Sequence, residues 1–349
     1  MTSVLALVVA ISLTLAGCGG GPAAGDQGKA PEQGKEKKFR VAYVISGNLG
    51  DKSFFDSGMA GMERVQKELG AEIKVIQSVN SADWEPNLES AAQDGYDVVV
   101  AAASQMHDAI QNVAPKYPKV KFVYIDDVVK GDNIASITFA QNEGSFLAGA
   151  LAALMTTHTE LPGMNKEKII GWVGGSDIAV LHDFLTGYEQ GAKYIDPQVK
   201  VLSSFAGSFN DPAKGKELTL AQYNQGADIV MNVASGTGVG ILEAAKDAGK
   251  YAIGVDSDQD GIYPGHILTS MLKRVDNAVF DQVKLAKEGQ WKAGHFEYGL
   301  QNQGVGLTDM KVMGDKIPQE VRQKLADITA KVAKGEIKVD HYANFKVGQ

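Results

Sequence analysis

Carboxylates and aromatic rings stand directly after several short apolar runs of this chain. Asp51 and Phe54 follow one such run, and Asp126 ends a second. Phe209 follows a third run, and Asp256 ends a fourth. A carboxylate accepts hydrogen bonds and can act as an acid or base, and an aromatic ring offers a face for stacking. These residue types could therefore bind a ligand or perform acid–base chemistry, depending on which elements bring them together.

Several segments match catalytic or metal motifs only in part. The stretch 236–240, "GTGVG", departs from GxGxxG, and 212–217, "PAKGKE", lacks the Ser or Thr that follows Lys in a P-loop. The six histidines show no HExxH spacing, and no GxSxG occurs. The acidic run 256–261 begins like a calcium loop but has Ile267 where the last ligand belongs. We therefore expect no enzyme, cofactor or metal site.

The elements that must position these residues alternate along the chain. Helix-like segments separate Val- and Ile-rich runs, and such runs are typical of strands buried on both faces of a parallel sheet. The expected strands are 39–46, 71–76, 96–103, 121–126, 134–139, 168–175, 199–205, 227–233 and 251–256. The pattern restarts near residue 168, so we predict two doubly wound α/β lobes. Ligands bind beyond the carboxyl ends of such strands, and the candidate residues would meet there in an interlobe cleft.

We expect the lobes to be discontinuous in sequence. Lobe 1 is predicted to contain 39–139 plus about 266–304, and lobe 2 to contain 140–265 plus about 305–349. A chain of 349 residues is long enough to form two such lobes, each with its own core.

The N-terminal segment indicates export and anchoring. Residues 4–15 are apolar but too few to cross a bilayer, which needs roughly 20 residues, so they suit a signal peptide of residues 1–17. The run ends in "LAGC", which looks like a bacterial lipobox and makes Cys18, the single cysteine, the lipidated residue. Residues 18–38 are rich in Gly, Pro and charge, as a flexible tether is. A plain secretory signal is the alternative.

The charge balance limits the class of partner. The formal net charge is -8 and no basic stripe offsets it, which argues against a nucleic-acid surface. We therefore expect a small-molecule ligand, a membrane contacted only through the lipid anchor, and no nucleic acid.

Seven segments in order resemble the basic membrane protein family over about residues 39–310. They are "GDKSFFDSG", "FVYIDD", "QNEGSFLAGALAA", "SFNDPAKGKE", "ASGTGVGILEAAKDAG", "IGVDSDQ" and "TSMLKRVDNAV". Members are lipoprotein substrate-binding components of ABC importers, related to purine-nucleoside receptors. The resemblance implies the periplasmic-binding-protein type I fold and an ABC permease as partner, and we expect a monomer.

The resemblance also implies an aromatic platform for a nucleobase. Phe54 and Phe209 match the two rings that hold the base, and the neighbouring Asp51 belongs to the same expected site. Stacking on an aromatic side chain contributes roughly 1–3 kcal/mol per base. Phe55 stands where the family usually has Asn, so a hydrogen bond to the base edge would be lost. We expect Phe55 either to pack within its own lobe or to touch the ligand edge.

The polar part of the implied site would hold the base edge and the sugar. Asp126 matches an acid that accepts from base N–H groups, with Asp127 as the fallback. Asp256 matches the acid that accepts from vicinal ribose hydroxyls. Lys273 matches a lysine that donates to the sugar and offsets Asp256, and Gly236 would bring backbone N–H groups close to the sugar.

These features predict an extracytoplasmic, lipid-anchored solute-binding protein that captures a nucleoside, a purine nucleoside by the resemblance, for an importer. A sugar or a signalling molecule is the alternative ligand. A nucleoside-processing enzyme and a surface sensor or adhesin without transport are the alternatives from other classes.

Overall fold

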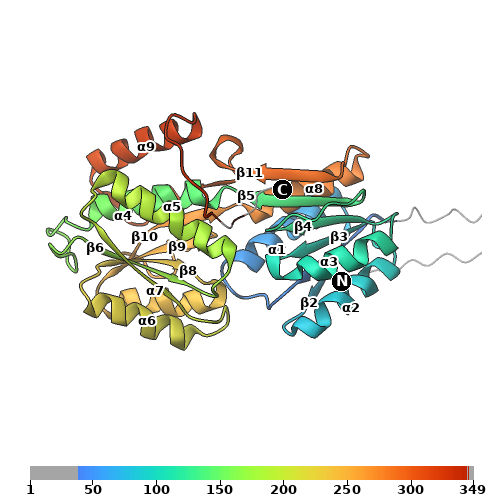
Figure 1. Cartoon of the computed structure of the whole chain (residues 1–349), viewed down its shortest axis with the longest axis horizontal. Helices are drawn as coiled ribbons and strands as arrows, with labels where there is room; N and C mark the ends of the chain where they lie inside the picture. Colours follow the sequence, from blue (N-terminus) through green and yellow to red (C-terminus); the bar gives the residue numbers. More distant parts are fainter. Residues whose placement is uncertain (1–37, 344, 346–349) are drawn as a thin grey trace, which may run out of the picture. The chain divides into compact units, whose positions relative to one another are not determined.

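A computed structural model describes residues 38–343 and 345 of the chain, which fold around two six-stranded sheets (Figure 1). The predictions for the signal peptide, for Cys18 and for the tether up to Lys37 concern residues outside this part. Within 38–343 and 345, none of the helices combines the length and the apolar character that crossing a membrane requires.

The first sheet is parallel throughout and has the strand order β11-β5-β4-β3-β1-β2. Its strands are β1 (Arg40–Ile45), β2 (Glu72–Gln77), β3 (Val98–Ala102), β4 (Lys121–Ile125), β5 (Ile134–Phe139) and β11 (Gly294–Tyr298). Helices α1 (Phe54–Leu69) and α8 (Val275–Lys287) pack on one face, and α2 (Trp84–Gln93) and α3 (His107–Val113) on the other. These elements form the first lobe.

The second sheet has the order β12-β10-β9-β8-β6-β7, with only β12 antiparallel to its neighbour. Its strands are β6 (Ile169–Gly174), β7 (Lys200–Phe205), β8 (Ile229–Val233), β9 (Tyr251–Asp256), β10 (Ile267–Lys273) and β12 (Val305–Leu307). Its helices are α4 (Gln141–Met155), α5 (Ala179–Ile195), α6 (Pro212–Asn224), α7 (Gly238–Asp247) and α9 (Gln319–Ala333). These elements form the second lobe.

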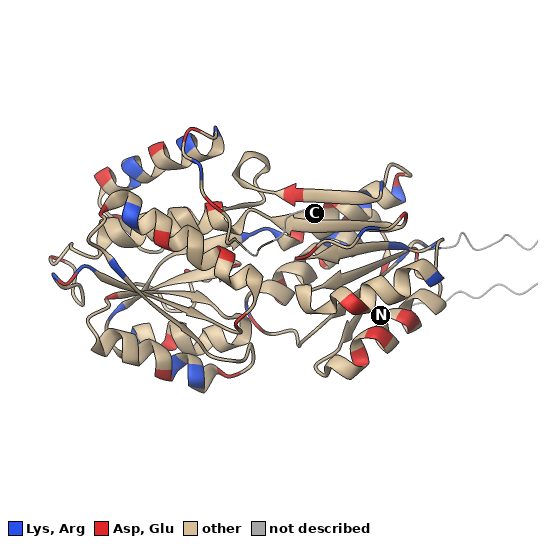
Figure 2. Ribbon diagram, in the orientation of Figure 1, with Lys and Arg blue, Asp and Glu red and all other residues tan. Residues whose placement is uncertain are grey.

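The central strands are buried because helices cover both faces of each sheet. All five residues of β3 and all six of β9 are buried, as the near-continuous apolar runs predict. In β1, Val41 and Tyr43 pack with the cluster that contains α1 and α8, whereas Ala42 packs with the cluster that contains α2 and α3. Charged residues lie mostly on the covering helices and loops (Figure 2).

One expected lobe boundary is wrong. The prediction placed residues from about 266 onward in lobe 1, but β10 pairs with β9 in the second sheet. The crossing to the first lobe therefore follows Lys273, where the chain leaves β10 and enters α8. The sequence pattern does not predict this strand, because its place in the second sheet is set by pairing with β9. The correction matters for the site, because it makes Lys273 a residue of the second lobe at the crossing point.

Helices α4 and α5 pack with their backbones almost in contact. A Cβ atom added to Gly191 would lie 1.9 Å from the carbonyl oxygen of Phe146, and one added to Gly187 would lie 2.1 Å from that of Asn142. Both neighbours are helical backbone, which cannot move aside as a flexible side chain could. The α4–α5 pair therefore depends on glycine at these positions.

We expect Gly191→Ala to lower the free energy of unfolding by about 1–3 kcal/mol, the usual cost of overpacking a well-packed core. Gly261→Ala is the control, because a Cβ there meets nothing within 4 Å. Urea unfolding of both variants measures the difference. Equal stabilities of the two variants would show that α5 can shift away from α4 without cost.

Candidate ligand-binding site

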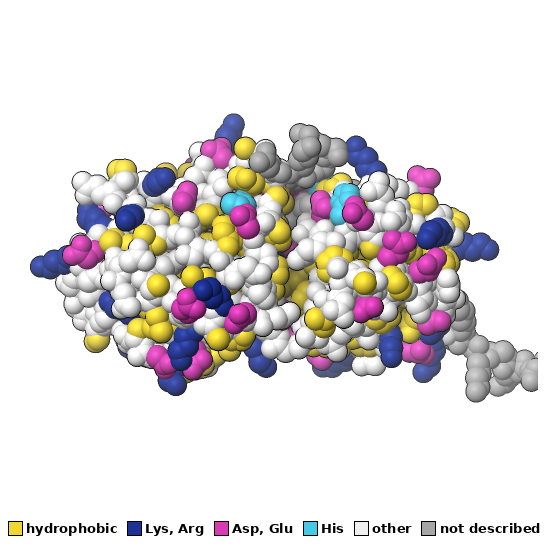
Figure 3. All heavy atoms as spheres, turned by 60° about the horizontal axis from the view of Figure 1, so that its bottom comes forward, with side chains coloured by type: hydrophobic (Ala, Val, Ile, Leu, Met, Phe, Trp, Pro, Cys, Tyr) yellow, Lys and Arg dark blue, Asp and Glu magenta, His cyan; other side chains and the backbone are white. Residues whose placement is uncertain are grey.

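A cavity of about 160 Å³ lies where the carboxyl ends of the strands from both lobes face each other. The surface is indented between the lobes, and hydrophobic side chains are visible in the indentation (Figure 3). Side chains from both lobes line the cavity. They include five of the predicted ligand-binding residues: Phe54, Asp126, Phe209, Asp256 and Lys273.

Two glycines at equivalent strand ends make room for aromatic rings. Gly47 follows β1, and a Cβ there would lie 2.5 Å from the ring of Phe55. Gly175 follows β6, and a Cβ there would lie 2.3 Å from the ring of Phe209. Each ring is thus seated on the backbone at the end of the first strand of its lobe, a close approach that only glycine permits.

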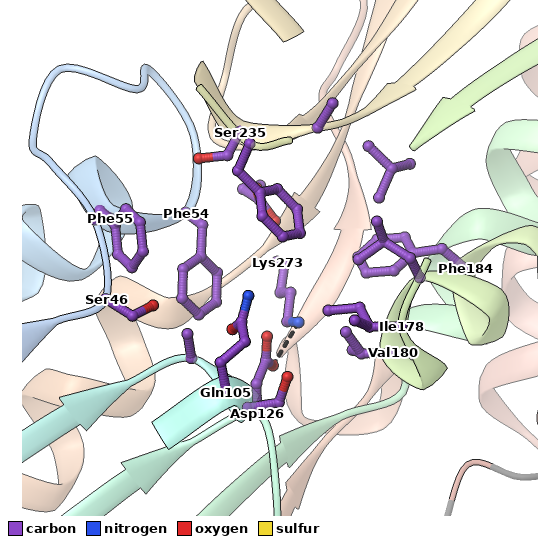
Figure 4. Close-up of a pocket in the computed structure, with 18 of the residues that line it drawn as sticks. Ser46, Phe54, Phe55, Gln105, Asp126, Ile178, Val180, Phe184, Ser235 and Lys273 are labelled. Carbon is purple, nitrogen blue, oxygen red and sulfur yellow. Dashed lines mark ion pairs between the residues drawn. The ribbon is translucent and has the colours of Figure 1, made fainter. Parts of the chain in front are cut away.

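The adjacent rings of Phe54 and Phe55 have different environments. Phe55 is 8% exposed and packs over Gly47 at the edge of the cavity. Phe54 is only partly buried, begins α1 and meets Phe55 edge-to-face, with 5.4 Å between ring centroids. Figure 4 shows Phe54 between Phe55 and Lys273. Phe54 therefore lines the cavity as a partly exposed ring, and Phe55 packs against its edge.

Lys273 is the cation of the cavity and is 1% exposed. Its Nζ lies 2.5 Å from Oδ1 of Asp126, so an ion pair joins β10 of the second lobe to the end of β4 in the first (Figure 4). The rings of Phe54, Phe139 and Phe184 surround the ammonium, with centroids 5.1–5.4 Å from Nζ. Aromatic faces and a carboxylate together compensate the burial of this charge.

This pairing differs from the expected one. The family resemblance predicts that Lys273 offsets Asp256, whereas the ion pair of Lys273 is with Asp126. The charge of Lys273 still acts on Asp256, because it is among the groups that lower the pKa of that carboxyl. Which of two nearby carboxylates a lysine contacts depends on the relative placement of the lobes, and the sequence carries no such information.

Asp256 is a buried acid of the cavity whose pKa is raised. Burial raises its pKa, and Lys273 and a hydrogen bond donated by the Ser53 hydroxyl lower it. Asp51 and Asp126 add smaller raising effects, and the balance places the pKa at about 7. Asp256 can therefore change charge near neutral pH, where an ordinary aspartate stays ionised.

Backbone strain gathers at the same strand ends. Of the eight non-glycine residues with positive φ in 38–343 and 345, four line the cavity. They are Ala103, Asp126, Ser235 and Asp256. Such conformations persist only where surrounding structure enforces them, and they gather at functional sites. Their position here supports a ligand site at this edge of the sheets.

Two predicted site residues do not line the cavity. Asp51 is buried beside it and accepts hydrogen bonds from the backbone N–H groups of Ser53, Phe55 and Asp56. It also accepts from the Ser235 hydroxyl of the second lobe at 2.8 Å. Asp51 thus shapes the turn into α1.

Gly236, the second of these, lies one residue beyond Ser235, which does line the cavity. A Cβ added to Gly236 would approach Asn210 and the carbonyl oxygen of Phe209. Asp127, the fallback for Asp126, lies 2.7 Å from the ring of His107 and is not a lining residue.

Sequence reasoning missed part of the lining. Polar groups come from loops and short 3-10 helices that follow strands, and they belong to Ser46, Gln105, Asn210 and Ser235. Their position just after a strand is a sequence signal from which these four residues could be predicted to line the cavity. An apolar wall comes from the start of α5, and it consists of Ile178, Val180, Leu181 and Phe184. These residues look like ordinary core residues of a helix, so no sequence signal distinguishes them.

Comparisons with known proteins identify the class that this fold and cavity define. Residues 38–341 match the Bmp family, described as ABC transporter substrate-binding protein PnrA-like. The ABC transporter nucleoside-binding protein BmpA of Lactococcus lactis is 33% identical over 97% of each chain. Basic membrane protein A2 of Borrelia garinii is 30% identical over 86% of this chain and 88% of its own. The chain belongs to this family, which confirms the resemblance.

A solved structure supports the same assignment. ABC transporter solute-binding proteins from Aeropyrum pernix superpose with a TM-score of 0.82 at 28% identity, over 88% of this chain and 94% of theirs. The periplasmic-binding-protein type I fold is thus confirmed. The chain is a substrate-binding protein of an ABC transporter, not an enzyme, and its partners are a small-molecule ligand and a permease.

Proposed function

We propose that the protein binds a nucleoside in the interlobe cavity and delivers it to an ABC importer. The observation that carries this proposal is that one cavity combines aromatic rings from both lobes, Phe54 and Phe209, with two carboxylates, Asp126 and Asp256. A flat base suits the rings, and the hydroxyls of a sugar suit a carboxylate. The relative from Lactococcus lactis is named as nucleoside-binding, which agrees with this assignment.

The contacts within the cavity give it one end that suits the base and another end that suits the sugar. Lys273 holds Oδ1 of Asp126, which leaves the other oxygen to accept from an N–H of the base. Gln105 and Asn210 carry amides, which can donate and accept at the base edge. Ser53 holds Oδ2 of Asp256, which leaves the other oxygen to accept from the ribose hydroxyls. Two carboxylates and a single lysine line the cavity, and this charge balance disfavours a phosphorylated ligand.

Ligand binding should favour the closed arrangement of the lobes, because the lining residues of both lobes can contact one ligand only when the lobes are together. The cavity is complete within one chain, so we propose that the protein acts as a monomer. We further propose that it works outside the cytoplasm, held at the membrane by lipid on Cys18, and relatives from Pyrococcus are named as lipoproteins.

Anchoring through Cys18 predicts a simple change of location. In the native host, Cys18→Ser should move the protein from the membrane fraction to the soluble extracytoplasmic fraction, because the acyl chains attach to the Cys18 thiol and N-terminus. Fractionation followed by immunoblotting measures this, and Ser3→Ala serves as the control. A variant that stays with membranes after a carbonate wash would refute lipid anchoring at Cys18.

Mass spectrometry of small molecules released from the purified, denatured protein tests the proposed ligand class. We expect a nucleoside in stoichiometric amount from protein purified without unfolding. Asp256→Ala protein, prepared in parallel, should release much less. Recovery of a free sugar instead would replace the nucleoside assignment with the alternative ligand class.

A further inference from the structure

Two loops from opposite lobes touch directly beside the cavity. The turn that precedes α1 contributes Lys52 and Ser53, and the turn after β9 contributes Ser257 and Gln259. The Ser257 hydroxyl donates to the carbonyl oxygen of Ser53 at 3.1 Å, and the Gln259 amide donates to that of Lys52 at 2.9 Å. We call these four residues, with Asp256, the seam. Its hydrogen bonds join protein groups and use no ligand atom.

One seam contact reaches the ligand-binding carboxylate itself. Ser53 is fully buried, and its hydroxyl donates to Oδ2 of Asp256. Ser53 belongs to the first lobe and Asp256 to the second, so this bond exists only while the lobes are together. The backbone N–H of Ser53 donates to Asp51, which helps to hold the turn that carries this hydroxyl. Ser53 does not line the cavity, whereas Asp256 does.

We propose that Ser53 is a positioning residue that completes the ligand-binding carboxylate when the lobes close. By holding one oxygen of Asp256 from the opposite lobe, Ser53 orients the other oxygen toward the cavity and stabilises the ionised form. Lobe closure and the charge of Asp256 are thereby coupled. The effect of this coupling on ligand affinity rests on the proposed nucleoside function. The hydrogen bonds of the seam do not depend on which ligand is bound.

The groups that face Asp256 determine the sign of the pH dependence. Lys273 from β10 and the Ser53 hydroxyl favour the charged carboxylate, and Asp51 and Asp126 of the first lobe oppose it. Ribose hydroxyls donate to the ionised form, so nucleoside affinity should rise with pH and level off above the pKa of about 7. Removing Ser53 removes a group that lowers this pKa, so the rise should move to higher pH.

The test compares Ser53→Ala with Ser257→Ala. Both variants lose one hydrogen bond across the seam, but only Ser53→Ala removes a contact with Asp256. Guanosine affinity is measured by titration calorimetry from pH 5.5 to 9. We expect the midpoint for Ser53→Ala to rise by about one pH unit, which is the scale of one charge-assisted hydrogen bond. Ser257→Ala should weaken binding equally at every pH.

Two further variants show whether the shift acts through Asp256. In an Asp256→Asn background, Ser53→Ala should leave the pH profile of guanosine binding unchanged. Ser53→Thr, which keeps a hydroxyl, should restore the wild-type midpoint. Parallel profiles for Ser53→Ala and Ser257→Ala would overturn the proposal, and so would a shift that persists without the Asp256 carboxylate.

A measurement without ligand separates this proposal from the proposed function. Because the folded-state pKa of Asp256 lies above its unfolded value, its contribution to stability is full below about pH 4 and is lost as pH rises to about 7. In Ser53→Ala this loss should continue above pH 7, so its stability difference from wild type should widen there. For Ser257→Ala the difference should stay constant. If guanosine does not bind but this widening occurs, the nucleoside assignment fails and the Ser53–Asp256 coupling stands; a constant difference for both variants refutes the coupling.

Discussion

Asp256→Ala should weaken nucleoside binding by about a hundredfold, at least as much as the loss of either aromatic ring of the cavity. Loss of a buried, hydrogen-bonded charge partner costs roughly 2–5 kcal/mol, because the groups it held are left unpaired. Here those groups would be the ribose hydroxyls and Ser53, and Lys273 would lose a nearby negative charge. Titration calorimetry at pH 8, where Asp256 is ionised, measures the effect.

Asp258→Ala is the matched control for Asp256→Ala. Asp258 lies two residues further in the same turn, is exposed and does not line the cavity. Its replacement should leave affinity within about twofold, since surface substitutions of this kind usually have small effects. Equal affinities of the two variants for a nucleoside would mean that Asp256 has a structural role only.

Phe54→Ala and Phe209→Ala should each weaken nucleoside binding by roughly 1–3 kcal/mol, or about tenfold to a hundredfold. The two rings come from different lobes and line one cavity, so either loss exposes a face of the base. Phe54→Ala also removes one of the rings around Lys273. The same calorimetric titration at pH 8 measures both variants.

Two companion variants separate stacking from burial. Phe→Leu at position 54 or 209 keeps an apolar side chain but loses the aromatic face, and it should recover only part of the affinity. Phe205→Leu is the control, because Phe205 packs on Trp172 and does not line the cavity. If Leu restores full affinity at both positions, the rings act by burial alone and the stacking account is wrong.

Much of the architecture follows from local sequence patterns. The buried strands β3, β8 and β9 are near-continuous apolar runs, and each is followed by glycine, serine or acidic residues at its carboxyl end. This pattern predicts the sheets and also the edge at which the site lies. Phe54, Asp126 and Asp256 were found in this way, with the family resemblance supplying their expected roles.

What the sequence could not predict depends on how the lobes meet. The pairing of Lys273 with Asp126, and the contact of Ser53 with Asp256, both join residues more than a hundred positions apart. Strand β10 was missed because its place is set by pairing with β9. Phe184 lies on α5, where the apolar residues have the spacing of any helix that packs on a core. Each of these features depends on tertiary contacts, which leave no periodic pattern in the local sequence.

Titration calorimetry of the wild-type protein with guanosine, inosine, adenosine, uridine, ribose and guanine tests the central claim most directly. A nucleoside should bind at least a hundredfold more tightly than ribose or guanine, because ribose engages only the Asp256 end of the cavity and guanine only the end with the aromatic rings and Asp126. If ribose binds as tightly as every nucleoside, the rings of Phe54 and Phe209 contribute no base recognition, and the protein is not a nucleoside-binding component.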